Sequence, residues 1–148
     1  MEKGMTNRRG RTHTISAQVR EWAVDELKRA LALHPEVAFA YLHGSFVSEP
    51  VFRDLDVAVY LDPEVPDRKP PWQYESELGS ELEAALRMPV DVRVLNCAAL
   101  SFRYQAVKGH LLAAREADLV DEFRARTWDD YFDFAPFARR YLREVLSE

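Results

Sequence analysis

The sequence predicts an α/β (α+β) domain: a small mixed sheet with helices packed on it and a helical C-terminal segment. Three short apolar runs, 37–42, 55–61 and 90–95, are rich in branched and aromatic residues and have the length of strands. Residues 15–33 and 72–87 repeat apolar side chains at steps of three and four, the period of a helix with one buried face. Strands separated by such helices indicate a sheet covered by helices.

The first helix is expected to begin at Ile15 or Ser16, with Thr14 or Ser16 as its N-cap, and to end before Pro35. Its apolar positions are Val19, Ala23, Leu27, Ala30 and Leu31. Four prolines then mark the segment 62–71. Because proline fits neither a helix interior nor a central strand, this segment is expected to be an exposed connection.

The second helix, 72–87, is followed by the third strand. The apolar positions of this helix are Tyr74, Leu78, Leu82, Ala85 and Leu86, and its acids, Glu75, Glu77, Glu81 and Glu83, are expected to form a solvated face. Strand alternation directs Val90, Val92 and Val94 to one side and Asp91, Arg93 and Leu95 to the other.

The C-terminal part is expected to contain a helix over 98–107 that stops near Gly109, a short strand at 111–113, and further helix from Asp118 that Pro136 breaks or kinks. Its aromatic residues are Trp128, Tyr131, Phe132, Phe134, Phe137 and Tyr141. They fit two interpretations equally, core packing against the sheet or a surface for a partner. Arg139, Arg140 and Arg143 are interpreted as a solvated helix face, with an acidic partner or RNA as the alternative.

Length and composition indicate one soluble domain over 15–148, preceded by a flexible basic arm over 1–14. The arm is either an ordinary chain terminus or a tail that binds nucleic acid or a partner. A formal net charge of −5 argues against a protein whose whole surface binds nucleic acid. Nucleic acid is therefore not expected as a direct substrate.

Cysteine usage and hydropathy predict a cytoplasmic protein. Cys97 is the single cysteine, so neither an internal disulfide nor a cysteine zinc site can form, and this residue is expected to be buried as a small side chain. The basic N-terminus is followed by no apolar signal region, and no apolar run is long enough to cross a bilayer.

The residues with the clearest chemistry lie at the ends of the first two strands. Asp54 and Asp56 are two positions apart, so both project from one side of their strand, opposite Leu55 and Val57. Two close carboxylates beside a core stay ionised when a cation lies between them, and such oxygen ligands suit Mg²⁺, which shares its remaining positions with substrate phosphates.

Gly44 and Ser45 supply the complementary half of the site. Glycine at a strand end lets backbone approach a ligand closely, and the serine that opens the next turn offers its hydroxyl and nearby N–H groups to an anion. Asp91 can act as a third carboxylate if its strand lies beside the strand of Asp56. The alternative is that Asp91 pairs with Arg93.

The four histidines, His13, His34, His43 and His110, have no metal-ligand spacing, and none of them is expected to be catalytic.

Gly44–Ser45, the spacer, Asp54-x-Asp56 and the later Asp91 together resemble the signature of the DNA polymerase β-like nucleotidyltransferase superfamily. In size and tail, the chain is similar to the minimal nucleotidyltransferase (MNT) branch, the antitoxins of HEPN/MNT pairs. The match spans about residues 36–141. The chain departs from many relatives at 47–49 and at Arg53, and its spacer is shorter.

The resemblance implies a polymerase β-like fold, ATP as substrate bound at Gly44 and Ser45, and two Mg²⁺ ions held by Asp54, Asp56 and Asp91. Asp91 would also help to deprotonate the acceptor. It further implies that AMP is transferred to a hydroxyl, expected to be a tyrosine, of a cognate HEPN ribonuclease toxin that forms a hetero-oligomer with this chain. The alternatives are an antitoxin that inhibits by binding alone, or a nucleotidyltransferase for a small molecule.

Overall fold

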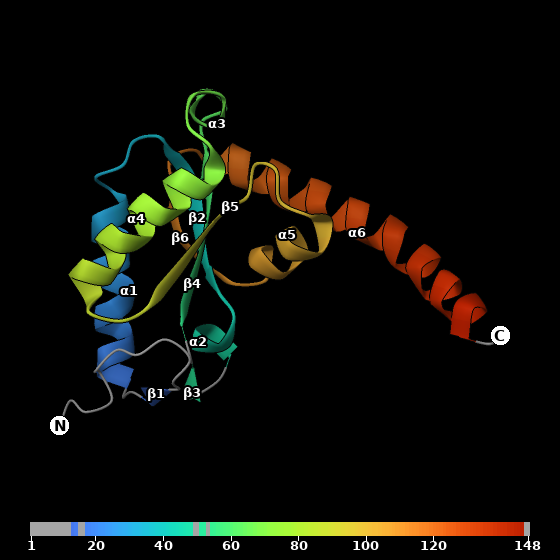
Figure 1. The fold of residues 1–148 in the computed structure, drawn as a ribbon, viewed down its shortest axis with the longest axis horizontal. Coiled ribbons are helices and arrows are strands. Elements are labelled where there is room, and N and C mark those ends of the chain that lie inside the picture. The colour runs from blue at the N-terminus through green and yellow to red at the C-terminus, as the bar shows by residue number, and fades with distance from the viewer. Residues whose placement is uncertain (1–12, 15–16, 49–50, 53, 147–148) are drawn as a thin grey trace.

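A computed structural model describes residues 13–14, 17–48, 51–52 and 54–146, which form a mixed sheet with helices on both faces (Figure 1). The elements are β1 (His13–Thr14), α1 (Ala17–Leu31), β2 (Val37–His43), α2 (Ser45–Ser48), β3 (Val51–Phe52), β4 (Leu55–Leu61), α3 (Glu64–Arg68), α4 (Pro71–Leu86), β5 (Val90–Val94), α5 (Leu100–Val107), β6 (His110–Ala114) and α6 (Ala117–Leu146). The main sheet has the order β5-β4-β2-β6, in which β4 and β5 are parallel and the other neighbours antiparallel. The predicted small mixed sheet is confirmed.

Two hydrophobic clusters lie on opposite faces of this sheet. Helices α1 and α4 cover the face that carries Leu55, Val57 and Val59, while α5 and α6 cover the face that carries Tyr41 and Ala58. Strand β2 is buried along its whole length because it lies between two strands and under helices on both faces. Its apolar run therefore does not alternate, as is usual for a strand that is buried on both faces.

The face under α6 is packed by aromatic rings. Phe39 stacks on Tyr60 of the next strand with ring centroids 5.0 Å apart and also contacts Phe123 of α6 at 5.4 Å. Arg124, one position further along α6, donates a hydrogen bond of 2.9 Å to the hydroxyl of Tyr41. These contacts hold the first half of α6 against the sheet.

The alternation predicted for the third strand is confirmed. Val90, Val92 and Val94 of β5 are buried, whereas Asp91 and Arg93 are exposed. The strand is an edge of the sheet, and its outward-facing N–H groups at Val90 and Val94 donate to Glu83 and Glu75 of α4, at 3.0 and 2.9 Å. The prediction that all the α4 glutamates are solvated is therefore wrong for these two, which cap the open edge.

Two other burial predictions are also wrong. Ala85 lies on the exposed side of α4, because the buried side follows Leu78, Leu82 and Leu86. Cys97 is exposed, because it follows the end of β5 in the turn that leads to α5.

The segment 62–71 is not only a connection, because it contains the short helix α3. Pro63 is the N-cap of this helix, and Pro66 lies in its first turn. Proline is tolerated there because N–H groups in the first turn have no partner within the helix. Pro71 likewise occupies the first position of α4.

Helix α6 continues through Pro136 without a break. The proline removes one backbone hydrogen bond, but the helix keeps the bonds on either side of it. Of the two expected effects of Pro136, a break or a kink, the break does not occur. One helix of 30 residues leaves the domain past α5 (Figure 1).

The predicted arm over 1–14 lies mostly outside the described residues. Ser16, one of the two candidate N-caps of α1, also lies outside them. The last two residues of the arm, His13 and Thr14, pair with Val51 and Phe52 as a two-stranded antiparallel sheet. None of the described helices combines the length and apolar content needed to cross a bilayer.

Candidate active site

The sheet brings Asp56 and Asp91 together. Parallel pairing of β4 and β5 places Asp91 directly beside Asp56, and antiparallel pairing of β2 and β4 places His43 on the other side of Asp56. These three residues form a row across three neighbouring strands. Asp54 precedes β4 by one residue and contributes a third carboxylate to the surroundings of Asp56.

The carboxylates lie on the sheet face that α5 and α6 cover, but at the end that these helices leave open. Asp56 is half-buried, and the side chain of Asp91 is 49% exposed. Phe102 of α5 contacts the ring of His43 edge-on, with centroids 5.3 Å apart, and so marks the boundary of the covered part. A ligand can reach the carboxylates from the open end.

Gly44 is required where β2 turns into α2. Its φ is +82°, in the left-handed region, and a Cβ at this position would lie 2.2 Å from Oδ2 of Asp56. No other residue type leaves space for that carboxylate oxygen without a shift. The turn at Gly44 therefore lies directly against the side chain of Asp56.

The pKa of Asp56 is raised to about 6. Burial of its carboxylate is the largest cause, and repulsion by the carboxylates of Asp91 and Asp54 adds to it. Oδ1 of Asp54 is buried and has no hydrogen-bond partner among the described residues. A buried carboxylate oxygen without a partner, beside two further carboxylates, is an arrangement that a cation would stabilise.

Within the described ranges, no cationic side chain neutralises this cluster fully. Burial lowers the pKa of His43, although the Asp91 carboxylate opposes this effect, so the imidazole is neutral at pH 7. Nε2 of His43 is buried without a hydrogen-bond partner among the described residues. The alternative pairing of Asp91 is present but long: its Oδ2 lies 3.8 Å from Nε of Arg93, beyond hydrogen-bonding distance, and both side chains are about half exposed.

Among the residues that the structure describes, no three His, Cys, Asp or Glu side chains are gathered tightly enough to form a ready metal site. The chemistry of the donors nevertheless fits Mg²⁺, which prefers few carboxylates and takes its other ligands from water and substrate phosphates. Asp54, Asp56 and Asp91 are the residues that could hold such an ion.

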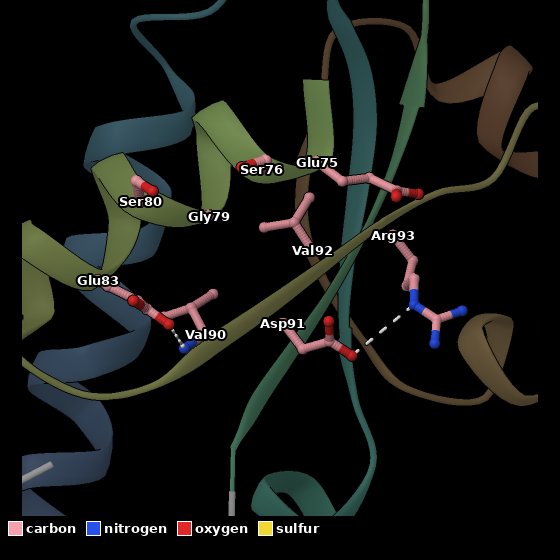
Figure 2. Close-up of a pocket in the computed structure, with 9 residues that line it drawn as sticks. All are labelled: Glu75, Ser76, Gly79, Ser80, Glu83, Val90, Asp91, Val92 and Arg93. Atoms are coloured by element: carbon pink, nitrogen blue, oxygen red, sulfur yellow. Dashed lines mark hydrogen bonds and ion pairs between the residues drawn. The ribbon is translucent and has the colours of Figure 1, made fainter. Parts of the chain in front are cut away.

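A polar cavity borders the site on the outer edge of β5. Figure 2 shows Asp91 and Arg93 on one side of the strand, and the serine, glycine and glutamate positions of α4 along the other. The cavity is lined by Glu75, Ser76, Gly79, Ser80, Glu83 and residues 90–93. Only Asp91 and Arg93 belong to both the cavity and the carboxylate end, so the cavity adjoins the candidate site without containing it.

Arg20 holds the helix that follows the Gly44 turn, a contact that the sequence did not reveal. Its guanidinium donates a hydrogen bond to the carbonyl of Phe46 and lies over the ring of Phe46, 4.8 Å from the centroid. Phe46 is buried next to the Gly44 turn, so Arg20 attaches α2 to α1. Nothing in the sequence links these positions, because the contact depends on how α1 lies on the sheet.

The family model described as "Polymerase beta, Nucleotidyltransferase" matches residues 25–118, well over half of the chain. No curated protein matches the chain by sequence.

Several solved structures share the fold. A crystal structure of the toxin–antitoxin MntA–HepT is 20% identical, with a TM-score of 0.66, and the match covers 85% of this chain and 98% of that one. A structure of a tri-AMPylated Shewanella oneidensis HEPN toxin in complex with MNT antitoxin is 21% identical, with a TM-score of 0.66, and the match covers 86% of this chain and 98% of that one. A crystal structure of a toxin–antitoxin with AMP-PNP is 22% identical, with a TM-score of 0.68, and the match covers 83% of this chain and 98% of that one. At these identities the likeness establishes the fold alone, and it confirms the fold expected from the sequence.

Proposed function

Because this chain belongs to the polymerase β nucleotidyltransferase family, we propose that it transfers AMP from ATP to a tyrosine hydroxyl of a HEPN-domain toxin and so neutralises the toxin. The observation that carries this proposal is the pairing of Asp56 with Asp91 on neighbouring parallel strands, with the Gly44 turn against Oδ2 of Asp56. This arrangement places an acidic centre beside a glycine turn whose backbone a substrate phosphate can approach closely.

In the proposed reaction, Gly44 and Ser45 hold the phosphates of ATP next to the carboxylates. Asp54, Asp56 and Asp91 would hold two Mg²⁺ ions, which would supply positive charge to stabilise the transition state. Asp91 accepts the proton of the acceptor hydroxyl. The hydroxyl oxygen then forms a bond to the α-phosphorus while the bond from that phosphorus to the bridging oxygen breaks, and pyrophosphate leaves.

The choice of a protein acceptor rests on the solved relatives. One of them is a tri-AMPylated HEPN toxin bound to an MNT antitoxin, and another is a toxin–antitoxin with AMP-PNP. The open end of the site also suits a macromolecular acceptor, because the side chains of Asp91 and Arg93 are about half exposed. A cytoplasmic location and a stable complex with the toxin are part of the same proposal.

Incubation of the full chain with MgATP and its cognate HEPN-domain toxin is expected to add the mass of one or more AMP units to the toxin. Intact-mass spectrometry measures the addition, and peptide mapping locates it. A toxin variant with phenylalanine at the mapped tyrosine should no longer be modified. Inhibition of an unmodified toxin would contradict the transferase and leave an antitoxin that acts by binding alone.

A further inference from the structure

The side chain of Arg93 lies beside the carboxylates without forming a hydrogen bond to them. Its Nε is 3.8 Å from Oδ2 of Asp91, longer than a hydrogen bond, and Figure 2 shows the two side chains next to one another. The guanidinium also lies over the ring of Phe102, 5.5 Å from the centroid, and that ring contacts His43 edge-on. Arg93 therefore lies at the border between the covered and the open part of the carboxylate face.

The gap between Arg93 and Asp91 has the width that one hydroxyl group can bridge. An oxygen about 2.8 Å from each group fits between a donor and an acceptor that are 3.8 Å apart. Such a hydroxyl would accept a hydrogen bond from the guanidinium and donate one to the carboxylate. Among the described residues none accepts a hydrogen bond from this guanidinium, and the side chain is 55% exposed, so its N–H groups are available to a ligand.

The order of the strands places this gap on the acceptor side of the proposed reaction. Gly44 follows β2, Asp56 lies on β4 and Asp91 lies on β5, so the three positions follow one another across the sheet. The attacking and leaving oxygens lie roughly in line on opposite sides of the phosphorus. With the phosphates at the Gly44 turn, the acceptor hydroxyl enters from the β5 side.

A cavity of about 350 Å³ extends from Arg93 to the start of α5. Besides Arg93, Glu75 and Cys97, its lining is apolar and consists of Pro71, Val94, Ala98, Ala99 and Phe102. The other cavity on this edge, beside α4, has serine and glutamate side chains in its lining instead. An aromatic ring suits the apolar cavity, and a phenol carries its hydroxyl at the far end of such a ring.

We infer that Arg93 recognises the phenol of the acceptor tyrosine: the ring lies in the apolar cavity beside Phe102, and the hydroxyl lies between Arg93 and Asp91. This inference rests on the proposed function in that the acceptor is a tyrosine of the toxin. It adds the residue and the cavity that select an aromatic hydroxyl.

In this arrangement Asp91 takes the proton of the phenol, and an electron pair of the phenol oxygen forms the bond to the α-phosphorus. The bond from that phosphorus to the bridging oxygen breaks, and pyrophosphate leaves with its electron pair. Arg93 stays protonated throughout and stabilises the negative charge that develops on the phenol oxygen.

The first test measures AMP transfer from MgATP to the cognate HEPN-domain toxin by the full chain and its variants. Arg93→Ala is expected to lower kcat about a hundredfold, because one donor to a developing negative charge is removed. Arg93→Lys keeps the charge and should recover at least tenfold of this loss. Arg68→Ala removes an exposed arginine of α3 and is the matched control, which should transfer AMP at the parental rate.

Ala99→Trp tests the cavity. Ala99 is exposed at the N-cap of α5, so a large side chain there fills the cavity without entering the core. The KM for the toxin is expected to rise at least tenfold, whereas the KM for ATP should not change. A KM for the toxin equal to that of the parent chain would place the acceptor ring elsewhere and would overturn the inference.

A fluorinated acceptor separates recognition of the phenol from a purely structural role of Arg93. Fluorine lowers the pKa of a phenol, so a fluorinated tyrosine depends less on a positive charge beside its oxygen. With 3,5-difluorotyrosine at the mapped position of the toxin, the loss caused by Arg93→Ala should shrink at least tenfold. An equal loss with both toxins would mean that Arg93 acts on ATP or on the fold, and the inference would fail.

Circular dichroism and MgATP binding verify that each variant is folded. A parent chain that transfers AMP no faster than Arg93→Ala overturns the inference and leaves the proposed function standing. A parent chain that transfers no AMP at all rejects the proposed function, and the inference with it.

Discussion

Replacing Asp56 with asparagine is expected to reduce AMP transfer by about a thousandfold or more, because it removes the central carboxylate of the site. Asp56 lies between His43 and Asp91 in the sheet and against the Gly44 turn, so no neighbouring carboxylate can take its place. Asp54→Asn and Asp91→Asn are also expected to reduce AMP transfer. Radiolabelled AMP incorporation into the toxin measures all three.

Asp67→Asn is the matched control. Asp67 is an exposed residue of α3, which follows the far end of β4 from Asp56, and its replacement changes the net charge by the same amount. Its activity should equal that of the unaltered chain. Transfer by Asp56→Asn at the parental rate would reject the assignment of the site.

The same Asp56→Asn change is expected to stabilise the metal-free protein at pH 7. The pKa of Asp56 is raised from 3.8 to about 6 in the folded protein, so the folded state binds more protons than the unfolded state between these values. The free energy of unfolding therefore falls as the pH rises from about 4 to about 6, and the penalty is fully present above that window. After a discount for solvent screening it amounts to about 1–2 kcal/mol.

Thermal unfolding in EDTA at pH 4 and pH 7.5 measures this effect. At pH 7.5 the melting temperature of Asp56→Asn should be higher than that of the parent chain, and at pH 4 the two should be nearly equal. The melting temperature of Asp67→Asn should differ from that of the parent chain by the same amount at both pH values. A variant that is less stable than the parent at both values would mean that the carboxylate of Asp56 is stabilised by the fold rather than strained by its neighbours.

Gly44→Ala is expected to lower AMP transfer at least a hundredfold and to destabilise the fold by about 2–3 kcal/mol. The new Cβ would lie 2.2 Å from Oδ2 of Asp56, and the backbone at φ +82° is strained for alanine. Either the turn or the carboxylate has to move, and both belong to the candidate site. Chemical denaturation and the AMP incorporation assay measure the two effects.

Gly79→Ala is the control for this change. A Cβ at Gly79 in the interior of α4 meets the Val90 carbonyl at 3.7 Å and Cγ2 of Val92 at 3.8 Å, which are ordinary contacts. Alanine there should stabilise the protein by about 0.5–1 kcal/mol, since it favours the helix. Equal activity of the two alanine variants would show that the close approach of Gly44 to Asp56 has no role in the reaction.

The strands and most helices could be predicted because each has a local signal in the sequence. The alternation of Val90, Val92 and Val94 with Asp91 and Arg93 specifies which side chains share a face, and the structure confirms it. The errors have local explanations too. Prolines that occupy the first turn of a helix do not prevent it, as in α3, and a glutamate can cap a strand edge instead of facing water.

The sequence by itself determined the chemistry that is available: three aspartates on or directly before strands, a glycine-serine turn, and an aromatic-rich last helix. Only the tertiary structure decided that β5 lies parallel to β4 with Asp91 beside Asp56, and that Arg20 secures the turn from another helix. It also decided that the C-terminal part of α6 runs past α5 and away from the rest of the domain. Side-chain periodicity is a property of neighbouring residues, whereas strand order and the place where a helix leaves the core depend on contacts between residues far apart in the chain.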